Sequence, residues 1–580
     1  MTFNAFYILV ILCLGASACS RADSQRERRP VADPITLAVV NARVWTGDRD
    51  APWAEALAVS GERLAAVGTT ADVRQLAPAV TPIDAGGRLV LPGFIDTHVH
   101  FLEGGLRLAS VQLRDARTRD EFVSRIKAFA ATVPEGTWIT GGDWDHTLWG
   151  GELPSRDWID AATPNHPVWI NRLDGHMSLA NSAALKAANV TRATADVPGG
   201  EIVRGAGGEP TGLLKDNATA LVDKVAPPPS AEMRRRAVAA AMRYVAERGV
   251  TTVHDMSTSA AWDDMALYAE LRTTKALQTR IYSVVPLAQW ERLRDVVARR
   301  EHGGTDGLGD DWLRIGGLKG FVDGSLGSHT AAFNEPFKDA PNDRGLLVNT
   351  PEDLDRWISG ADKAGLQVMV HAIGDRANTL ILDTFARVAN ENGPRDRRFR
   401  IEHAQHLAPR DIPRFAQLNV IASMQPYHAI DDGRWAEQYI GDRIATTYAF
   451  RSLIDARATI AFGSDWFVAP PTPLEGIYAA VTRRTLDGRN PDGWVPGQKI
   501  TVEEAVRAYT ANAAYASFDE RHKGILSKGR LADFVMLERN IFEVAPEEIA
   551  GVRVRMTVVG GKPSFDSAAA SQGVGSAGGS

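Results

Sequence analysis

Two histidines separated by a single residue, His98 and His100, are the first side chains whose type and spacing could perform chemistry. They close an apolar run that begins at Leu91, and the two-residue period of a β-strand places both imidazoles on one face. Two neutral imidazoles on one face can bind a single zinc or related ion. Two half-buried polar residues without a metal are the alternative, so the interpretation depends on polar residues further along the chain.

Four later apolar runs also end in residues that a metal centre could use. They are residues 313–319, 366–371, 399–403 and 459–465, which end in Lys319, His371, His403 and Asp465. Another run, residues 420–426, carries no obvious ligand. The repeated pattern is an apolar strand closed by a polar residue.

Segments with helical signals separate these runs. Thr350 precedes a proline at the first helical position and an acid at the third, and Thr501 has Glu504 at the capping-box position of a helix over 502–514. With residues 250–254 and 279–285 as the second and third strands, eight strands alternate with helices. We therefore predict an α/β fold, a (β/α)8 TIM-type barrel over residues 91–515, with the polar residues at the carboxyl ends of its strands, where such barrels place their chemistry.

These residues resemble the metal centre of the amidohydrolase superfamily, and finer motifs are similar to its family 3 branch, which includes N-substituted formamide deformylases. The motifs are Gly93-Phe-Ile-Asp-Thr-His98, Asp174-Gly-His176, Asn181-Ser-Ala-Ala-Leu185, Lys319-Gly-Phe-Val-Asp-Gly324, His371-Ala-Ile-Gly-Asp375, Glu402-His-Ala-Gln405 and Gly463-Ser-Asp465. The resemblance extends from about Ile35 to about Asp566. It is specific for the fold and the metal site and poorly specific for the substrate.

The resemblance implies zinc as the cofactor, with one or two divalent ions. A protonated lysine cannot ligate a cation, but in the resembling family the lysine on the fourth strand reacts with carbon dioxide to a carbamate that bridges two ions. His98, His100, Lys319 and Asp465 would then surround one ion, and Lys319, His371 and His403 the other. A single ion is the simpler outcome if Lys319 stays uncarboxylated.

The expected reaction is hydrolysis of an amide, N-formyl or related carbon–nitrogen bond in a small molecule. Zinc makes water a nucleophile at neutral pH, and Asp465 can take the proton of that water and pass it to the leaving amine. Two alternatives stay open. One is a non-hydrolytic isomerase or decarboxylase on the same scaffold, and the other is a non-catalytic barrel that binds a ligand.

An insertion at about residues 108–229 separates the first two barrel strands and can form a lid or pocket wall. The family motif makes His176 a candidate substrate contact, with a structural histidine in a turn as the alternative. Asp323, in the loop after Lys319, is a second candidate. Trp144 is a third, although tryptophans in a large domain are core residues by default.

Three further histidines lie near the predicted metal ligands in the chain or in the barrel. His406, three residues beyond His403, is an alternative ligand but would face elsewhere once the strand has ended. His428 and His254 lie near the predicted barrel mouth, outside the ligand set of the resembling family.

Composition excludes some functions. The chain has 580 residues, 44% of them hydrophobic, and a net charge of −6, which supports a large core and gives no electrostatic footprint for nucleic acid. No segment after the first twenty residues approaches the ~20 apolar residues of a membrane span. The sequence indicates no oligomeric state.

The N-terminus has the pattern of an export signal. A short apolar run is followed by Ala16-Ser-Ala18, which predicts a signal peptide over residues 1–18. Cys19 resembles the lipidated cysteine of a bacterial lipobox, although the usual leucine three places earlier is absent, so simple secretion stays open. We expect a periplasmic protein whose membrane contact is a lipid anchor in the outer membrane.

The remaining segments complete the predicted organisation. Residues 19–34 are expected to be a tether and residues 567–580 a disordered tail. Short strand patterns in residues 35–90 and 516–566 predict a small flanking β-sandwich built from both ends of the chain. The only other cysteine, Cys13, lies in the apolar run of the signal, so packing and metal must stabilise the folded body without disulfides.

Overall fold

A computed structural model describes residues 34–256, 260–301, 303 and 307–569. The predicted signal peptide, Cys19, nearly all of the tether and residues 570–580 of the predicted tail lie outside the described residues. Residues 567–569, which we predicted to be disordered, are helical and follow the last strand directly. In the part of the chain that the structure describes, no helix combines the length and apolar character needed to cross a membrane.

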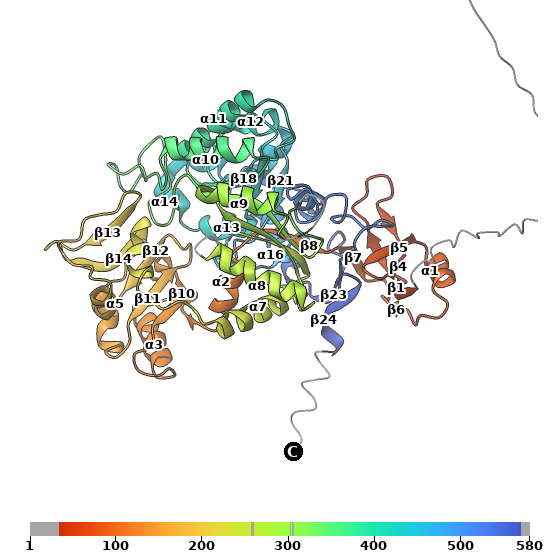
Figure 1. Cartoon of the computed structure of the whole chain (residues 1–580), viewed down its shortest axis with the longest axis horizontal. Coiled ribbons are helices and arrows are strands. Elements are labelled where there is room, and N and C mark those ends of the chain that lie inside the picture. Colours follow the sequence, from red (N-terminus) through yellow and green to blue (C-terminus); the bar gives the residue numbers. More distant parts are fainter. Residues whose placement is uncertain (1–33, 257–259, 302, 304–306, 570–580) are drawn as a thin grey trace, which may run out of the picture. The chain divides into compact units, whose positions relative to one another are not determined.

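Eight parallel strands form the central barrel (Figure 1), as predicted, and each pairs with its neighbour in chain order. The strands are β8 (Phe94–Val99), β15 (Val250–Asp255), β16 (Arg280–Pro286), β17 (Leu313–Phe321), β18 (Gln367–Ala372), β19 (Arg400–His403), β20 (Ile421–Met424) and β21 (Ile460–Phe462). Backbone hydrogen bonds from Asp465 to His98 (2.6 Å) and from His100 to Trp466 (2.5 Å) close the ring between the last strand and the first. The closure brings Asp465 beside the two histidines.

Helices cover the outside of the barrel, with α7 and α8 on one side of the strands in Figure 1 and α10 to α12 on another. The main helices are α2 (Phe101–Arg107), α7 (Ala231–Ala246), α8 (Ala261–Thr273), α9 (Trp290–Ala298), α10 (Pro351–Lys363), α11 (Asp375–Asn392), α12 (Ile412–Gln417), α13 (Pro426–Asp432), α15 (Phe450–Asp455), α16 (Pro473–Thr482), α17 (Val502–Ala508) and α18 (Ala511–Tyr515). Their apolar faces and the strands share one large hydrophobic core.

The helix signals read from the sequence lie where predicted, with one difference. Thr350 caps α10 by accepting a hydrogen bond from the Asp353 amide, and the capping box of Thr501 and Glu504 begins α17. The predicted helix 502–514 is nevertheless two helices, α17 and α18. It breaks at Tyr509, whose carbonyl accepts a hydrogen bond from Ile95 of β8 at 2.8 Å.

The apolar run that ends in the two histidines also divides, because it serves two sheets. Residues Leu89–Pro92 form β7 of a flanking sheet, and β8 of the barrel begins at Phe94. Gly93 lies at the crossing, where a Cβ atom would come within 2.3 Å of the Thr251 side chain. Only glycine allows the two sheets to meet this closely.

Strands from both ends of the chain flank the barrel in two sheets. One has the order β24-β23-β22-β7-β2-β3 and joins β2 (Arg43–Trp45) and β3 (Trp53–Ala54) to β22 (Phe534–Leu537), β23 (Val554–Val559) and β24 (Lys562–Asp566). The other has the order β5-β4-β1-β6, from β1 (Ile35–Val40), β4 (Ala56–Ser60), β5 (Arg63–Gly68) and β6 (Ile83–Asp84). Val39 and Leu57 of the second sheet share a hydrophobic cluster with Val90 and Phe534 of the first.

The insertion after the first barrel strand forms a six-stranded sheet of its own. Its order is β13-β14-β12-β11-β10-β9, from β9 (Val111–Gln112), β10 (Ile139–Trp144), β11 (Val168–Arg172), β12 (Met177–Ala180), β13 (Gly200–Arg204) and β14 (Pro210–Asp216). Helix α3 (Arg119–Ala130) shares a hydrophobic cluster with this sheet. The insertion is therefore a packed unit that can hold side chains rigidly at the barrel mouth.

Candidate metal centre

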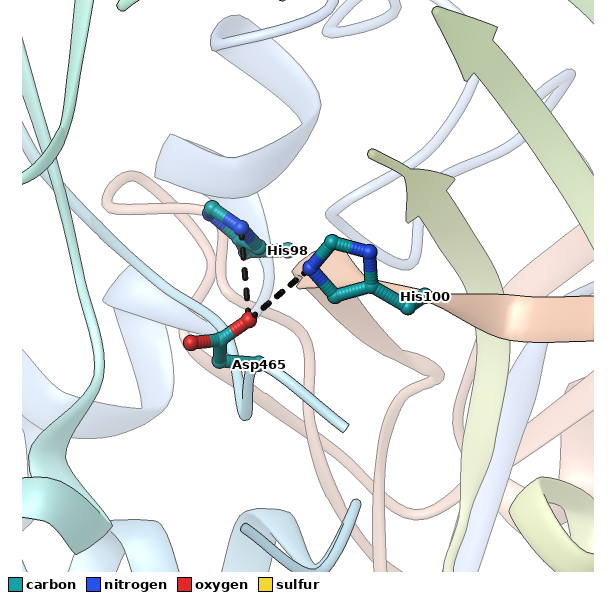
Figure 2. A group of neighbouring side chains, drawn as sticks. All are labelled: His98, His100 and Asp465. Carbon is teal, nitrogen blue, oxygen red and sulfur yellow. Dashed lines mark ion pairs between the residues drawn. The ribbon is translucent and has the colours of Figure 1, made fainter. Parts of the chain in front are cut away.

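His98, His100 and Asp465 converge at the carboxyl end of the barrel (Figure 2). The Oδ1 atom of Asp465 lies 3.4 Å from Nε2 of His98 and 3.3 Å from Nε2 of His100. A tetrahedral zinc ion with bonds of about 2.0–2.1 Å holds its ligand atoms about 3.4 Å apart. These three donor atoms therefore have the separation that one divalent ion requires.

Backbone and side-chain contacts with strand β8 hold Asp465 in place. Gly463 lets the two chains approach, since a Cβ atom there would lie 2.5 Å from the amide nitrogen of His98. Ser464 donates its amide (2.8 Å) and its hydroxyl (2.6 Å) to the carboxylate of Asp96. Asp465 itself has a φ of +62°, in the left-handed region, a conformation that functional sites retain when the surrounding contacts enforce it.

The protonation states at this end of the barrel suit metal binding. Burial lowers the pKa values of His98, His371 and His403 well below the ordinary value, so these imidazoles are neutral and have lone pairs to donate. Burial favours the neutral acid at Asp465, yet His98 and His100 hold its pKa well below the ordinary value. The carboxylate is therefore ionised at neutral pH.

Glu402 orients His98 from behind, a role that sequence reasoning missed. Its Oε2 atom lies 2.7 Å from Nδ1 of His98, and both side chains are fully buried. A carboxylate that holds one nitrogen of a ligating histidine directs the other nitrogen to the metal. The guanidinium of Arg400 lies 2.8 Å from the other oxygen of Glu402. The signal in the sequence was this pair of opposite charges, two residues apart within a predicted barrel strand.

Lys319 lies against the same group. Its Nζ atom is 3.2 Å from Nε2 of His98. Burial lowers the pKa of Lys319 to about 8, against the opposing influence of the Glu402 and Asp465 carboxylates. A fraction of this amine is therefore uncharged near neutral pH, the form that can react as a nucleophile.

His371 and His403 stand next to each other at the ends of β18 and β19. Their rings are 4.5 Å apart between centroids, and the ring of His403 is 4.9 Å from that of His98. Nε2 of His371 lies 3.0 Å from the carbonyl oxygen of Gly324, which fixes the orientation of the ring. The structure thus gathers all six ligands that the family resemblance implied at one end of the barrel.

His428, which we placed outside the ligand set, joins this centre. It lies in α13, and one donor atom each from His403, His428 and Asp465 lie within 4.8 Å of one another. His406, the alternative ligand, has other partners for both ring nitrogens: its Nδ1 lies 2.8 Å from the Thr447 hydroxyl and its Nε2 lies 3.1 Å from the Gln405 amide.

His176 reaches the centre from the insertion. Its ring is 5.1 Å from that of His371, and it lines the same cavity as His403 and Asp465. Nδ1 of His176 lies 2.6 Å from the buried carboxylate of Asp216, a partner that the sequence did not reveal. Burial favours the neutral ring, but Asp216 outweighs it and raises the pKa of His176 above its ordinary value.

Two other predicted substrate contacts, Trp144 and Asp323, are not among the residues that line this cavity. Trp144 is fully buried in the core of the insertion, and its indole donates to the carbonyl of Ile170 at 3.0 Å, so the default interpretation for a tryptophan holds. The carboxylate of Asp323 accepts hydrogen bonds from the amides of Ala332, Ile373 and Gly374 at 2.8–3.0 Å. Asp323 therefore ties the loops after β17 and β18 together.

Comparisons with known proteins agree with this arrangement. Residues 81–565 match the profile described as the amidohydrolase family. The chain is 42% identical to Protein LONG AFTER FAR-RED 3 of Arabidopsis thaliana, over 92% of each chain, and 28% identical to N-substituted formamide deformylase of Arthrobacter pascens, over 90% of this chain and 97% of that one. An uncharacterized metal-dependent hydrolase from Pyrococcus horikoshii superposes with a TM-score of 0.71 at 26% identity, covering 88% of this chain and 99% of that chain.

Proposed function

This chain belongs to the amidohydrolase family, and from that premise we propose that it is a zinc-dependent hydrolase of an amide, N-formyl or related carbon–nitrogen bond in a small molecule. The observation that carries the proposal is the convergence of His98, His100 and Asp465 at the separation that a divalent ion requires. The similarity to an N-substituted formamide deformylase supports the choice of bond.

The residues of the centre have different roles in the proposed hydrolysis. When bound, zinc acts as a Lewis acid that makes water nucleophilic near neutral pH. The ionised carboxylate of Asp465 accepts the proton of the attacking water and then donates it to the leaving amine nitrogen. His98 is kept in one orientation by Glu402 while this proton moves.

Lys319 sets the number of ions in this proposal. In the uncharged form, its amine nitrogen forms a bond to the carbon of carbon dioxide and gives up one proton to water, and the resulting carbamate carries the negative charge that a buried ammonium lacks. A carbamate at Lys319 would be shared between an ion on His98, His100 and Asp465 and a second ion on His371 and His403. We propose two ions when Lys319 is carboxylated and one when it is not.

His176 is the proposed substrate contact. Asp216 holds Nδ1 of His176 and raises the pKa of the ring, so the other nitrogen serves as a hydrogen-bond donor in the cavity. A donor fixed in this way can stabilise the oxygen that becomes negative when water attacks a carbonyl.

The proposal is tested by screening metal-loaded protein against a library of N-formyl and N-acyl amines in ¹⁸O-labelled water. We expect a released amine and one labelled oxygen in the acid product. Asp465→Asn should abolish turnover and leave the fold intact, whereas the control Asp157→Asn, at a side chain that is 83% exposed, should keep full activity. Product without the label would identify a non-hydrolytic reaction, and turnover by Asp465→Asn would remove the proton-transfer role.

A further inference from the structure

We infer that His428 is a metal ligand, which with His403 and Asp465 forms a second cation position beside that of His98 and His100. The inference rests on the proposed function, because it extends the metal centre on which hydrolysis depends. It adds a ligand to the second ion of that centre, the ion that the proposed function places on His371 and His403.

The barrel topology brings the three side chains together. Strands β19, β20 and β21 are neighbours in the sheet, and each is followed by one of the three residues. His403 ends β19, His428 is the third residue of α13, directly after β20, and Asp465 follows β21. A proline at the first helical position, Pro426, begins α13 close to the strand end and keeps His428 at the barrel mouth.

Each of the two histidines has one buried ring nitrogen without a partner in the part of the chain that the structure describes. Among the described residues, Nδ1 of His403 and Nε2 of His428 have no hydrogen-bond partner. Their rings are nearly parallel, 15° apart in orientation, with centroids 6.4 Å from each other. Buried polar atoms are nearly always satisfied in folded proteins, and a cation held by the two histidines would take up both lone pairs.

Asp465 can serve both positions with its two oxygens. Figure 2 shows that the contacts with His98 and His100 reach the same oxygen and that the second oxygen points away from them. A carboxylate that bridges two ions in this way suits the separation of about 3.5–4 Å found in two-metal sites. The three donor atoms of the second position all lie within 4.8 Å of one another, close enough for one ion to be held between them.

Metal titration of the full chain tests the inference without any substrate. Metal-free protein would be titrated with zinc by calorimetry, and bound zinc per chain counted by mass spectrometry after gel filtration. We expect wild-type protein to bind two ions and His428→Ala to lose one binding step or weaken it at least tenfold. The control His329→Asn, at a histidine paired with Asp339 at 3.0 Å, should keep both steps. An unchanged isotherm in His428→Ala overturns the inference.

A second variant reports coordination directly, even where His428→Ala folds poorly. The sequence has only two cysteines, Cys13 and Cys19, so His428→Cys places a thiol in a folded body that has none. Loading with cobalt should then produce a thiolate-to-cobalt charge-transfer band that cobalt-loaded wild-type protein lacks. Absence of the band in folded, cobalt-loaded His428→Cys overturns the inference. Because neither measurement uses turnover, such a failure leaves the proposed hydrolysis to its own test.

Discussion

Glu402 offers the sharpest perturbation of the metal centre, because it touches His98 on one side and Arg400 on the other. Glu402→Gln keeps the shape of the side chain and removes its charge. The charge-assisted hydrogen bond of 2.7 Å to His98 becomes a neutral one, which is roughly half as strong. The ion pair of 2.8 Å with Arg400 is lost as well.

The loss of the hydrogen bond to His98 lowers metal affinity, and the loss of the ion pair with Arg400 lowers the free energy of unfolding. Removing the partner of a ligating histidine typically weakens metal binding by about 10–100-fold, or about 1.4–2.7 kcal/mol. Removing one member of a buried ion pair costs about 3–5 kcal/mol of unfolding free energy. We expect the lower end of that range, since Arg400 also donates to the Thr97 carbonyl at 2.7 Å and to the Ser423 hydroxyl at 3.0 Å.

The double variant Arg400→Met, Glu402→Gln separates the two effects. It removes both buried charges, so the unfolding free energy of the apo protein should recover part of its loss. Zinc affinity should stay low, because His98 still lacks its charged partner. Denaturant unfolding of the apo proteins and competition with a zinc-binding dye measure the two quantities. Wild-type zinc affinity in Glu402→Gln would refute the idea that Glu402 prepares His98 for the metal.

Three other changes test separate parts of the structure. Lys319→Ala should lose at least one zinc per chain and most activity, and short carboxylic acids should partly restore both. Lys319→Arg should not restore them, because guanidinium stays charged. An unchanged number of zinc ions per chain in Lys319→Ala would rule out a bridging carbamate. Asp216→Asn removes the group that raises the pKa of His176 above 6.5. The wild-type advantage in thermal stability should therefore be full below that ordinary pKa and shrink as the pH rises through the higher pKa of the folded protein. An advantage independent of pH would contradict this pairing. Cys19→Ala should move the protein from the membrane fraction to the soluble fraction of fractionated cells, whereas an unchanged distribution would favour simple secretion.

The sequence alone determined the architecture and most of the candidate ligands. Each barrel strand is a short apolar run, five of these runs are closed by a candidate ligand, and strand periodicity is a local property of neighbouring residues. The closed barrel brings the carboxyl ends of its strands together, so His98, Lys319, His371, His403 and Asp465 converge once the eight strands are counted.

Tertiary structure alone decided which other residues share that site. Glu402 meets His98 across 304 positions of the chain, Asp216 meets His176 across 40 positions, and His428 meets His403 from a different element. No local pattern encodes these contacts, because they depend on which side chains face each other after the strands have paired. Tertiary packing also divides the first apolar run at Gly93 and buries Trp144 in the core of the insertion. In both cases the packing of elements against one another, and not spacing along the chain, decides which residues are buried.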